Sequence, residues 1–380
     1  MSRNVSRRES LLATGATLGL AGCIDNPLSN TAEDDGRGDD PDDVGHDVFQ
    51  LGSSQTQPLW ATAEEATGFV TLLTDEDDDP WMVEHPDEVD GLLSWLDETD
   101  FETSAIVYVE TAAPNTCYDE VGVSHVGIED GRIVATAEAV DGGGENQGCG
   151  EAVTYPSAFV RVSGDDLPAE AAFTVVDGWG ESAEVAADGR YADPATLPGH
   201  VRPDGDPAKL EELTCDDEEF QRLPGPAGDE AALGEAYDDE DLTFAMRVHA
   251  TQALSAGDDA SPRVGRGDEV RITLWNVSTD VQHTGTRHQW NLQVLTTEGW
   301  QDVRGTTDGD PVGYDDLAIE HRPGEGFEWS FELTEAGVVA GHEHEDRLEV
   351  CPDLQPGRYR FGYRGIVSGE PLAVEFDYRG

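Results

Sequence analysis

The chain has 380 residues, with 81 Asp plus Glu against 22 Lys plus Arg, which gives a formal net charge of -59 at pH 7. This balance excludes nucleic acid as a partner, because phosphate binding requires clustered basic side chains. The acids are spread between regular apolar runs, and 37% of the residues are hydrophobic. The charge therefore indicates a folded protein with an acidic surface adapted to concentrated salt, not a disordered tail.

Residues 1–23 have the order of features that an export signal has. Arg7 and Arg8 precede a short apolar run from Ala13 to Leu20, and the run ends in Leu-Ala-Gly-Cys. A basic start, a short apolar core and a small-residue cleavage site are typical of a removed signal, and paired arginines indicate the twin-arginine route. The last four residues resemble a lipobox, which implies a lipid on Cys23. We expect a protein anchored through Cys23 to the outer face of the cytoplasmic membrane.

Residues 24–45 follow as an acidic segment without aromatic residues or apolar periodicity. Such a composition predicts a flexible, self-repelling tether. A β-rich domain is then expected over residues 46–180. Strands are predicted at 68–73, 105–109, 159–162 and 172–176, and a short amphipathic helix is predicted from Pro86 to Leu96. Asp130-Gly131 supplies the two-residue turn of a hairpin that joins 121–129 to 132–140.

Residues 85–165 resemble the PrcB carboxy-terminal family of small exported β domains. The resemblance is carried by a helix before Asp100-Phe101, the strand from Ser104 to Val109, a Cys-Tyr stretch, the Asp-Gly hairpin and Thr154-Tyr155-Pro156. At one step the chain departs from the family, with Asn115-Thr116-Cys117-Tyr118 in place of Thr-Gly-Gly-Tyr. The resemblance implies a non-catalytic accessory module and no substrate.

Residues 181–240 are rich in Pro, Gly and acids and predict an irregular connector. Asp206-Pro207 is expected to begin a short helix within it, with Asp206 as the cap. Leu213 and Cys215 are expected to dock the end of the connector onto the next domain.

Residues 241–380 alternate with a period of two over about seven segments, which predicts an antiparallel β-sandwich of immunoglobulin size. Pro356-Gly357-Arg358-Tyr359 resembles the corner found before a late strand in bacterial immunoglobulin-like domains. This resemblance concerns the fold and transfers no activity. The predicted class is thus mainly β, with a small N-terminal α+β or β domain followed by an immunoglobulin-like antiparallel sandwich.

Four cysteines remain besides Cys23, an even number that in an exported protein favours disulfides. We predict the pairs Cys117–Cys149 and Cys215–Cys351. The first would join the loop before the hairpin to the glycine-rich loop after it, and the second would fasten the connector to the sandwich.

Candidate chemistry is sparse. His342 and His344 alternate on a predicted loop and could ligate a metal if a third ligand came from elsewhere. A cupredoxin copper site is excluded, because no histidine follows Cys351 and the three methionines are Met1, Met82 and Met246. Asn276-Val277-Ser278 fits a glycosylation acceptor.

No cofactor is expected, and no nucleophile elbow appears in the sequence. We therefore expect a non-catalytic, lipid-anchored binding or accessory protein of a halophile, with an unidentified cell-surface protein or glycan as its partner. Trp275, which alternates out of the apolar face of its strand, is the candidate contact residue. The alternative is an extracytoplasmic metal-binding protein that uses His342 and His344.

Overall fold

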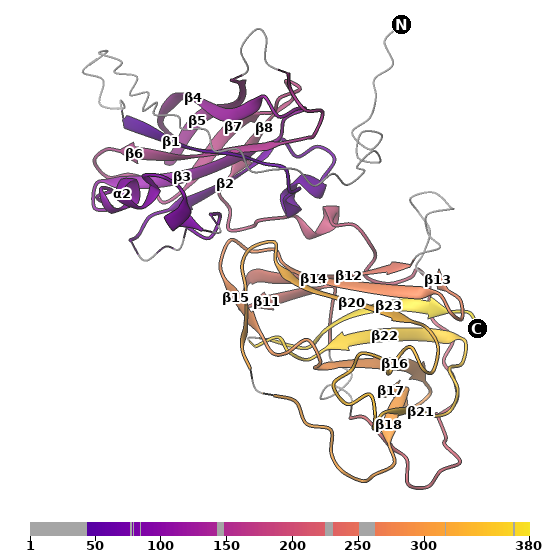
Figure 1. Ribbon diagram of the computed structural model, residues 1–380. Coiled ribbons are helices and arrows are strands. Elements are labelled where there is room, and N and C mark those ends of the chain that lie inside the picture. The colour runs from indigo at the N-terminus through magenta and orange to yellow at the C-terminus, as the bar shows by residue number, and fades with distance from the viewer. Residues whose placement is uncertain are drawn as a thin grey trace, which may run out of the picture.

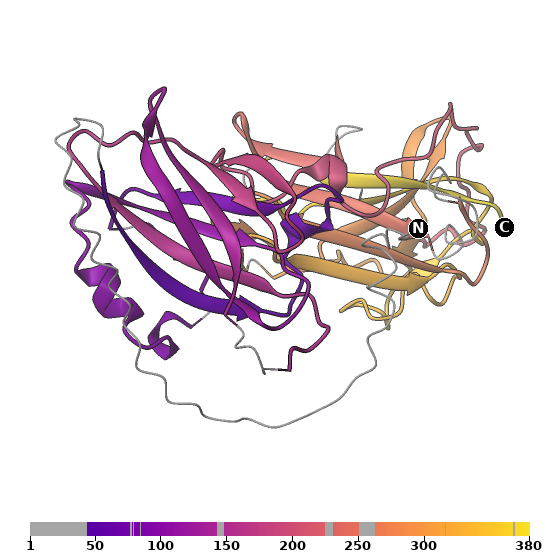
Figure 2. The ribbon, with the colours of Figure 1, turned by 90° about the horizontal axis from the view of Figure 1, so that it is seen from above.

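The computed structural model describes residues 44–380 except 77, 79, 84, 143–147, 225–230, 251–262, 316 and 368. The predicted signal and almost all of the predicted tether lie outside these residues. The described chain is mainly β, as predicted. It forms two β units, the first from the N-terminal part and the second from the C-terminal part, which lie side by side in both views (Figure 1 and Figure 2).

The first unit is built from two four-stranded sheets. One has the order β1-β6-β3-β2 and the other the order β4-β5-β7-β8. The strands of the first sheet are β1 (Gly45–Ser54), β2 (Gly68–Leu73), β3 (Ser104–Thr111) and β6 (Tyr155–Ser163). Those of the second are β4 (Tyr118–Glu129), β5 (Arg132–Asp141), β7 (Ala171–Val176) and β8 (Ser182–Ala186).

The two sheets of this unit share one apolar core. Val107 and Val160 of the first sheet and Ile133 and Phe173 of the second are all completely buried in it. Strand β3 is central and buried along its whole length, as its two-sided apolar sequence predicts. At one edge the amide of Gln50 on β1 accepts from Val121 N–H and donates to its carbonyl, which links the two sheets.

The outer face of the first sheet is covered by short helical segments. They are η2 (Leu59–Thr62), η3 (Pro86–Glu88) and α2 (Leu92–Asp97). The predicted amphipathic helix is therefore divided in two, because Gly91 adopts a φ of 82° between η3 and α2. Leu92 is fully buried while Leu93 is exposed, so the predicted apolar stripe faces the sheet only in part.

The predicted hairpin is present. Strands β4 and β5 pair antiparallel, and Glu129 lies opposite Arg132. Asp130 and Gly131 both have positive φ, at 49° and 78°, as a two-residue type I′ turn requires.

The second unit is a sandwich of two main sheets, one ordered β11-β12-β14-β20 and the other β10-β23-β22-β16-β17. The first contains β11 (Glu235–Asp238), β12 (Asp241–Ala250), β14 (Glu269–Asn276) and β20 (Gly326–Glu332). The second contains β10 (Ala232–Leu233), β16 (Trp290–Thr296), β17 (Gly299–Asp302), β22 (Gly357–Tyr363) and β23 (Leu372–Tyr378), and β13 (Arg263–Val264) pairs with β23.

Two smaller sheets complete this unit. Strands β15 (Gln282–Thr284) and β19 (Ile319–His321) form one, and β9 (Gln221–Arg222), β18 (Arg304–Thr306) and β21 (Glu349–Val350) form the other. The predicted alternation is confirmed by the core between the main sheets. Its fully buried members include Met246, Ile272, Leu292, Phe361 and Val374, which come from five different strands.

The connector departs from its prediction at two places. No helix forms after Asp206. Instead Leu210 lies beside Thr296 as a parallel bridge, with its N–H bonded to the Leu295 carbonyl. Contact with the sandwich thus outweighs the local capping signal. At the start of the connector, β8 pairs with β7 and adds a strand to the first unit. Leu213 docks into the sandwich core as predicted.

The connector also joins the two units directly. Tyr191 packs edge-to-face on Phe69 and Trp81 of the first unit, while its N–H donates to the carbonyl of Val277 in the second. Further along, His200 and Val248 exchange backbone hydrogen bonds beside β12. The short 3₁₀ turn η4 (Pro194–Thr196) lies between these contacts, capped by the Asp193 carboxylate.

Candidate functional site

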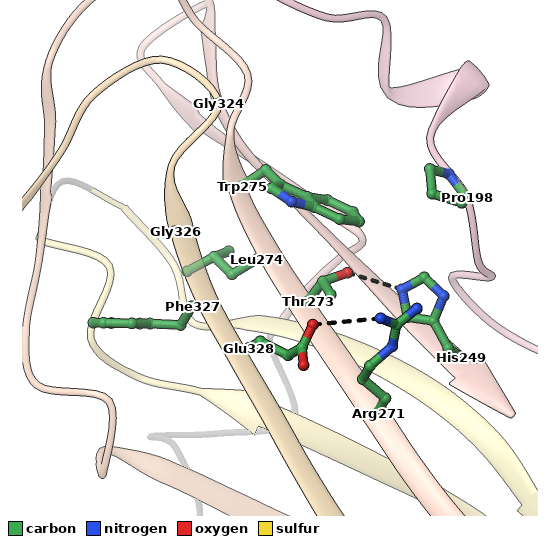
Figure 3. Close-up of a pocket in the computed structure, with 10 residues that line it drawn as sticks. All are labelled: Pro198, His249, Arg271, Thr273, Leu274, Trp275, Gly324, Gly326, Phe327 and Glu328. Carbon is green, nitrogen blue, oxygen red and sulfur yellow. Dashed lines mark hydrogen bonds and ion pairs between the residues drawn. The ribbon is translucent and has the colours of Figure 1, made fainter. Parts of the chain in front are cut away.

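A hollow of about 330 Å³ lies where the connector meets the outer face of the β12-β14-β20 sheet (Figure 3). This volume is at the lower end of the range for small-molecule sites, which occur preferentially where domains meet. It is lined by Pro198, His249, Arg271, Thr273, Leu274, Trp275, Gly324, Gly326, Phe327 and Glu328. We treat it as the candidate binding site.

The period of the strands places the key side chains of the site on one face. Val270, Ile272 and Leu274 of β14 point into the core, so Arg271, Thr273 and Trp275 point outward. His249 lies opposite Arg271 on β12, and Glu328 lies opposite Thr273 on β20. Three adjacent strands thus present a row of aromatic, charged and hydroxyl groups on their outer face.

Small residues on the neighbouring strands make room beside Trp275. Ala245 of β12 and Gly326 of β20 lie directly opposite it. A Cβ at Gly326 would be only 1.8 Å from the Leu274 carbonyl oxygen, so any larger residue would displace the strand. In Figure 3 the Trp275 ring extends from β14 toward Pro198.

The polar groups of the hollow are paired with one another. Glu328 accepts from Arg271 at 3.4 Å, and both side chains remain about half exposed. His249 Nε2 lies 3.0 Å from the Thr273 hydroxyl. Burial lowers the pKa of His249 to about 4, and the positive charge of Arg271 adds to this effect. The imidazole is therefore neutral at pH 7 and can exchange hydrogen bonds with an uncharged ligand.

The structure corrects the expected exposure of Trp275. The side chain does point away from the core of its own sandwich, but it is half-buried against the apolar cluster of Ala192, Leu197 and Val277 at the junction of the units. It forms a wall of the hollow, not a free surface patch. The other lining residues His249, Arg271 and Glu328 were not predicted from the sequence. Arg271 could have been found, because the alternation that points Trp275 out of the core points Arg271 to the same face.

The lining of the hollow consists mainly of an aromatic wall and hydrogen-bonding groups. Glu328 is the one carboxylate among its ten lining residues, and that carboxylate is already paired with Arg271, so the two facing carboxylates of a glycoside hydrolase are not among them. The hydroxyl of Thr273 lies beside the His249 imidazole.

The structure brings His342 and His344 together, with ring centroids 5.7 Å apart and His288 6.0 Å from His342. The metal interpretation gains no support from this arrangement. Within the described part of the chain, no three His, Cys, Asp or Glu side chains are arranged to hold a metal ion. His342 is buried, and its Nδ1 already accepts the His344 N–H. His344 Nε2 donates to the Gly313 carbonyl at 2.7 Å.

Asn276 is not placed as a glycosylation acceptor. Its side chain is completely buried. Its Nδ2 donates to the carbonyls of Asp280 and His321, and its Oδ1 accepts from the N–H and the hydroxyl of Ser278. A glycan on this nitrogen would break these bonds and would not fit in the folded domain. In the folded protein, Asn276 and Ser278 instead stabilise a turn through their side-chain hydrogen bonds.

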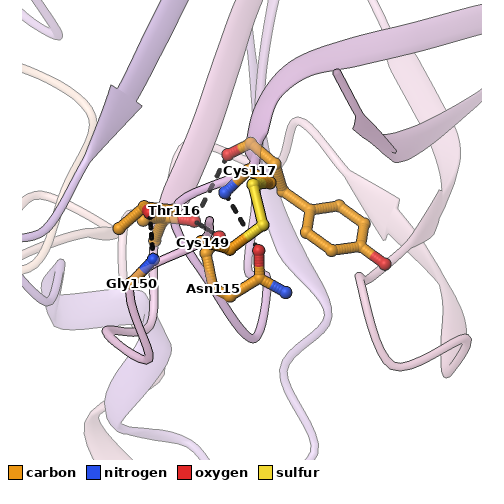
Figure 4. The surroundings of a disulfide bond; sticks show 7 residues. Asn115, Thr116, Cys117, Cys149 and Gly150 are labelled. Atoms are coloured by element: carbon orange, nitrogen blue, oxygen red, sulfur yellow. Dashed lines mark hydrogen bonds between the residues drawn. A yellow bond between two sulfur atoms is a disulfide. The ribbon is translucent and has the colours of Figure 1, made fainter. Parts of the chain in front are cut away.

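Both cysteine pairs are those expected from the sequence. Cys117 is bonded to Cys149, and Cys215 to Cys351. The first bond lies between the segment before β4 and the segment after β5, where Thr116 and Gly150 also exchange hydrogen bonds (Figure 4). Residues 143–147 of the glycine-rich loop lie outside the described residues. The second bond fastens the connector beside β21.

The predicted lipid site Cys23 lies outside the described residues. Among the helices that the structure does describe, none has the length and apolar character of a membrane span.

Comparison with known proteins gives no family for this chain. No protein-family model matches it, and no curated protein does. Several solved structures align weakly, and two of them are β-glucosidases. One is a β-glucosidase involved in saponin metabolism from intestinal bacteria, with 18% identity, a TM-score of 0.19 and coverage of 42% of this chain and 20% of that one. The other is a β-glucosidase from Listeria innocua, with 15% identity, a TM-score of 0.19 and coverage of 45% and 22%. The chain thus spans about a fifth of each, and neither likeness carries a functional argument.

Proposed function

We propose that this is a non-catalytic, lipid-anchored binding protein of the cell surface of a halophile, and that it holds a surface glycan in the hollow beside Trp275. The observation that carries the proposal is the lining of that hollow, in which one indole stands beside Thr273, neutral His249 and the Arg271–Glu328 pair. A protein partner is the other outcome that the experiment below tests.

The chemistry of the lining favours a sugar. A pyranose ring has an apolar C–H face that packs on an indole, and its hydroxyls form hydrogen bonds around the rim. Guanidinium and carboxylate groups can each make two such bonds in one plane. Trp275 is the one tryptophan among the lining residues, and tryptophan side chains contribute strongly to binding because they bury a large area with little loss of conformational freedom.

The charge of the chain supports short-range recognition. In concentrated salt the screening length falls to about 3 Å, so the -59 net charge cannot attract a partner over distance. Salt does not screen hydrogen bonds and van der Waals contacts inside the hollow in this way, because the groups are in direct contact. Anchoring through Cys23 would hold the hollow within reach of the surface layer, and the PrcB-like resemblance of residues 85–165 agrees with an accessory role.

The test is binding of the full chain to cell-surface glycans and to glycan-free surface protein at high salt. Trp275→Ala should weaken glycan binding at least tenfold, measured at a temperature well below the unfolding of both proteins, because the loss of its packing against the junction cluster also lowers the melting temperature. Trp179→Ala is the matched control, because Trp179 is exposed in the turn between β7 and β8 and does not line the hollow. Equal glycan binding by the parent and Trp275→Ala would reject the site, and binding to protein alone would reject the glycan.

A further inference from the structure

A second polar cluster, separate from the hollow, holds buried hydrogen-bond donors that have no acceptor. Arg304 is completely buried at the start of β18. Its Nε donates to Asp302 at 3.2 Å and its Nη2 donates to the Trp290 carbonyl at 2.8 Å, but its Nη1 has no hydrogen-bond partner. His342 Nε2 and Arg364 Nε are likewise buried without a partner.

Two aromatic rings bring these groups together. The Arg304 guanidinium lies 3.8 Å from the centre of the Trp290 ring, and the His342 ring packs on the same indole at 5.8 Å. Tyr314 links His342 to Arg364, with the His342 ring at 5.9 Å and the Arg364 guanidinium at 4.9 Å from its centre. The two rings therefore connect Arg304, His342 and Arg364, which come from three segments distant in sequence.

The three atoms of Arg304, His342 and Arg364 that lack a partner are all donors, and Asn291 Oδ1, on an amide that donates to Asp302, is a buried acceptor without one. Because Nδ1 of His342 accepts the His344 N–H, the proton of the neutral ring is on Nε2. The His288 backbone lies close enough to this ring to raise its pKa, but it does not meet the distance and angle of a hydrogen bond to Nε2. A buried donor without an acceptor is costly, and folded proteins leave very few of them.

The charge at the cluster is positive. Asp302 balances Arg304, but Arg364 adds a second guanidinium. The pKa of His342 is lowered to about 3, mainly by burial and then by the charge of Arg304, so a cation is unfavourable here. Glu343 is the nearby acid, and it pairs with His344 at 3.6 Å on the partly exposed side.

We propose that the Arg304–His342–Arg364 cluster binds a small inorganic anion. An anion accepts from several donors at once and donates to none, whereas a water molecule would bring two protons that also need acceptors. Hydrogen bonds from charged donors to an anion are about twice as strong as neutral ones. The anion would fasten the segments that carry Tyr314, His342 and Arg364 to the sandwich, and it would be tightly held although the protein itself is strongly acidic.

The first test is thermal unfolding of the full chain in sodium chloride, sodium sulfate and sodium gluconate at equal ionic strength. A ligand that binds only the folded state raises the melting temperature in a saturable way. Equal ionic strength removes the general screening effect. We expect the melting temperature to rise in a saturable way with chloride or with sulfate, compared with gluconate. A response to chloride would identify a halide site, and a response to sulfate would identify an oxyanion site.

Variants locate the effect. Arg364→Gln should weaken the anion response at least tenfold, and His342→Gln should do so as well. Arg132→Gln, which removes a partly exposed arginine of the first unit paired with Glu184, should leave the response unchanged. Equal melting in all three salts, or an unchanged response in Arg364→Gln, would overturn the proposal.

The second test does not depend on stability. Crystals grown with bromide should show an anomalous peak within hydrogen-bond distance of Arg304 Nη1, His342 Nε2 and Arg364 Nε. If sulfate is the acting anion, tetrahedral density should stand there instead. An ordered water in that place under both conditions would contradict the proposal.

Discussion

The indole N–H of Trp60 donates a 2.6 Å hydrogen bond to Oε2 of Glu110, and both side chains are buried. Burial raises the pKa of Glu110 to about 7, although the hydrogen bonds from Trp60 and Tyr108 act in the opposite direction. Burial, and after it the charge of Glu110, raises the pKa of Tyr191, the residue that packs on the first unit and bonds to the second. The first unit therefore holds a carboxyl that titrates near neutrality beside the junction of the two units.

Glu110→Gln should make the protein more stable at pH 8.5 and remove part of its pH dependence. The folded pKa lies above the usual value of 4.5, so the folded state binds the extra proton between about pH 4.5 and 7. The contribution of Glu110 to stability is present at low pH and is lost as the pH rises through 7. The amide still accepts from Trp60 and carries no charge, so the gain at pH 8.5 should be about 3 kcal/mol.

Urea unfolding at pH 5.5 and 8.5 in constant high salt measures this difference. Glu184→Gln, at an exposed position of β8, is the control and should change stability equally at both pH values. A Glu110→Gln variant with the parent's slope of stability against pH would contradict the assignment.

Removing the Cys215–Cys351 disulfide should cost more stability than removing Cys117–Cys149. The two bonds span 136 and 32 residues of sequence, and the entropy lost by the unfolded chain grows with the length of the loop. Loop-closure arithmetic gives about 5 and about 4 kcal/mol before any strain or residual structure. Unfolding of the two double Cys→Ala variants in denaturant gives the order. A larger loss for the Cys117 and Cys149 variant would show that loop length does not govern these bonds.

The fold should depend on salt. Carboxylates repel one another over about 10 Å at 0.1 M salt and over about 3 Å at 1 M, and the chain has 81 acids with only 22 Lys and Arg to balance them. We expect loss of the cooperative unfolding transition on dialysis from molar to millimolar salt, followed by circular dichroism. A protein that unfolds cooperatively in dilute buffer would show that its acidic surface is not an adaptation to salt.

Cys23→Ser should release the protein into the medium. The sequence before Cys23 predicts cleavage and lipid attachment at that residue, and the sulfur is the atom that would carry the lipid. Fractionation of cells that express the parent and the variant, together with the mass of the mature N terminus, tests this. Cys117→Ser is a control that keeps the predicted anchor. Membrane association equal to that of the parent would refute anchoring through Cys23.

The sequence by itself determined many of the strands and their buried faces, although not β1 or β8. Val70, Val107, Ile272 and Phe361 are core residues of predicted strands, because a period of two assigns alternate side chains to opposite faces before any partner is known. The Asp130-Gly131 turn could also be predicted from the sequence alone, because the positive φ angles of a two-residue hairpin turn are accepted by few residue types. The order of strands in the sheets was not accessible, because it depends on contacts far apart in sequence.

Only the tertiary structure decided the sites. Asn276 matches an acceptor motif locally, but long-range packing buries its amide against Asp280 and His321. Asp206 has a local capping signal, but the following residues bond to a strand of the sandwich. His342 was predicted on a loop, and only the tertiary structure shows that it is buried near Arg304. The hollow and the donor cluster combine residues from separate segments, and the energy of a buried polar group depends on what surrounds it rather than on its neighbours in sequence.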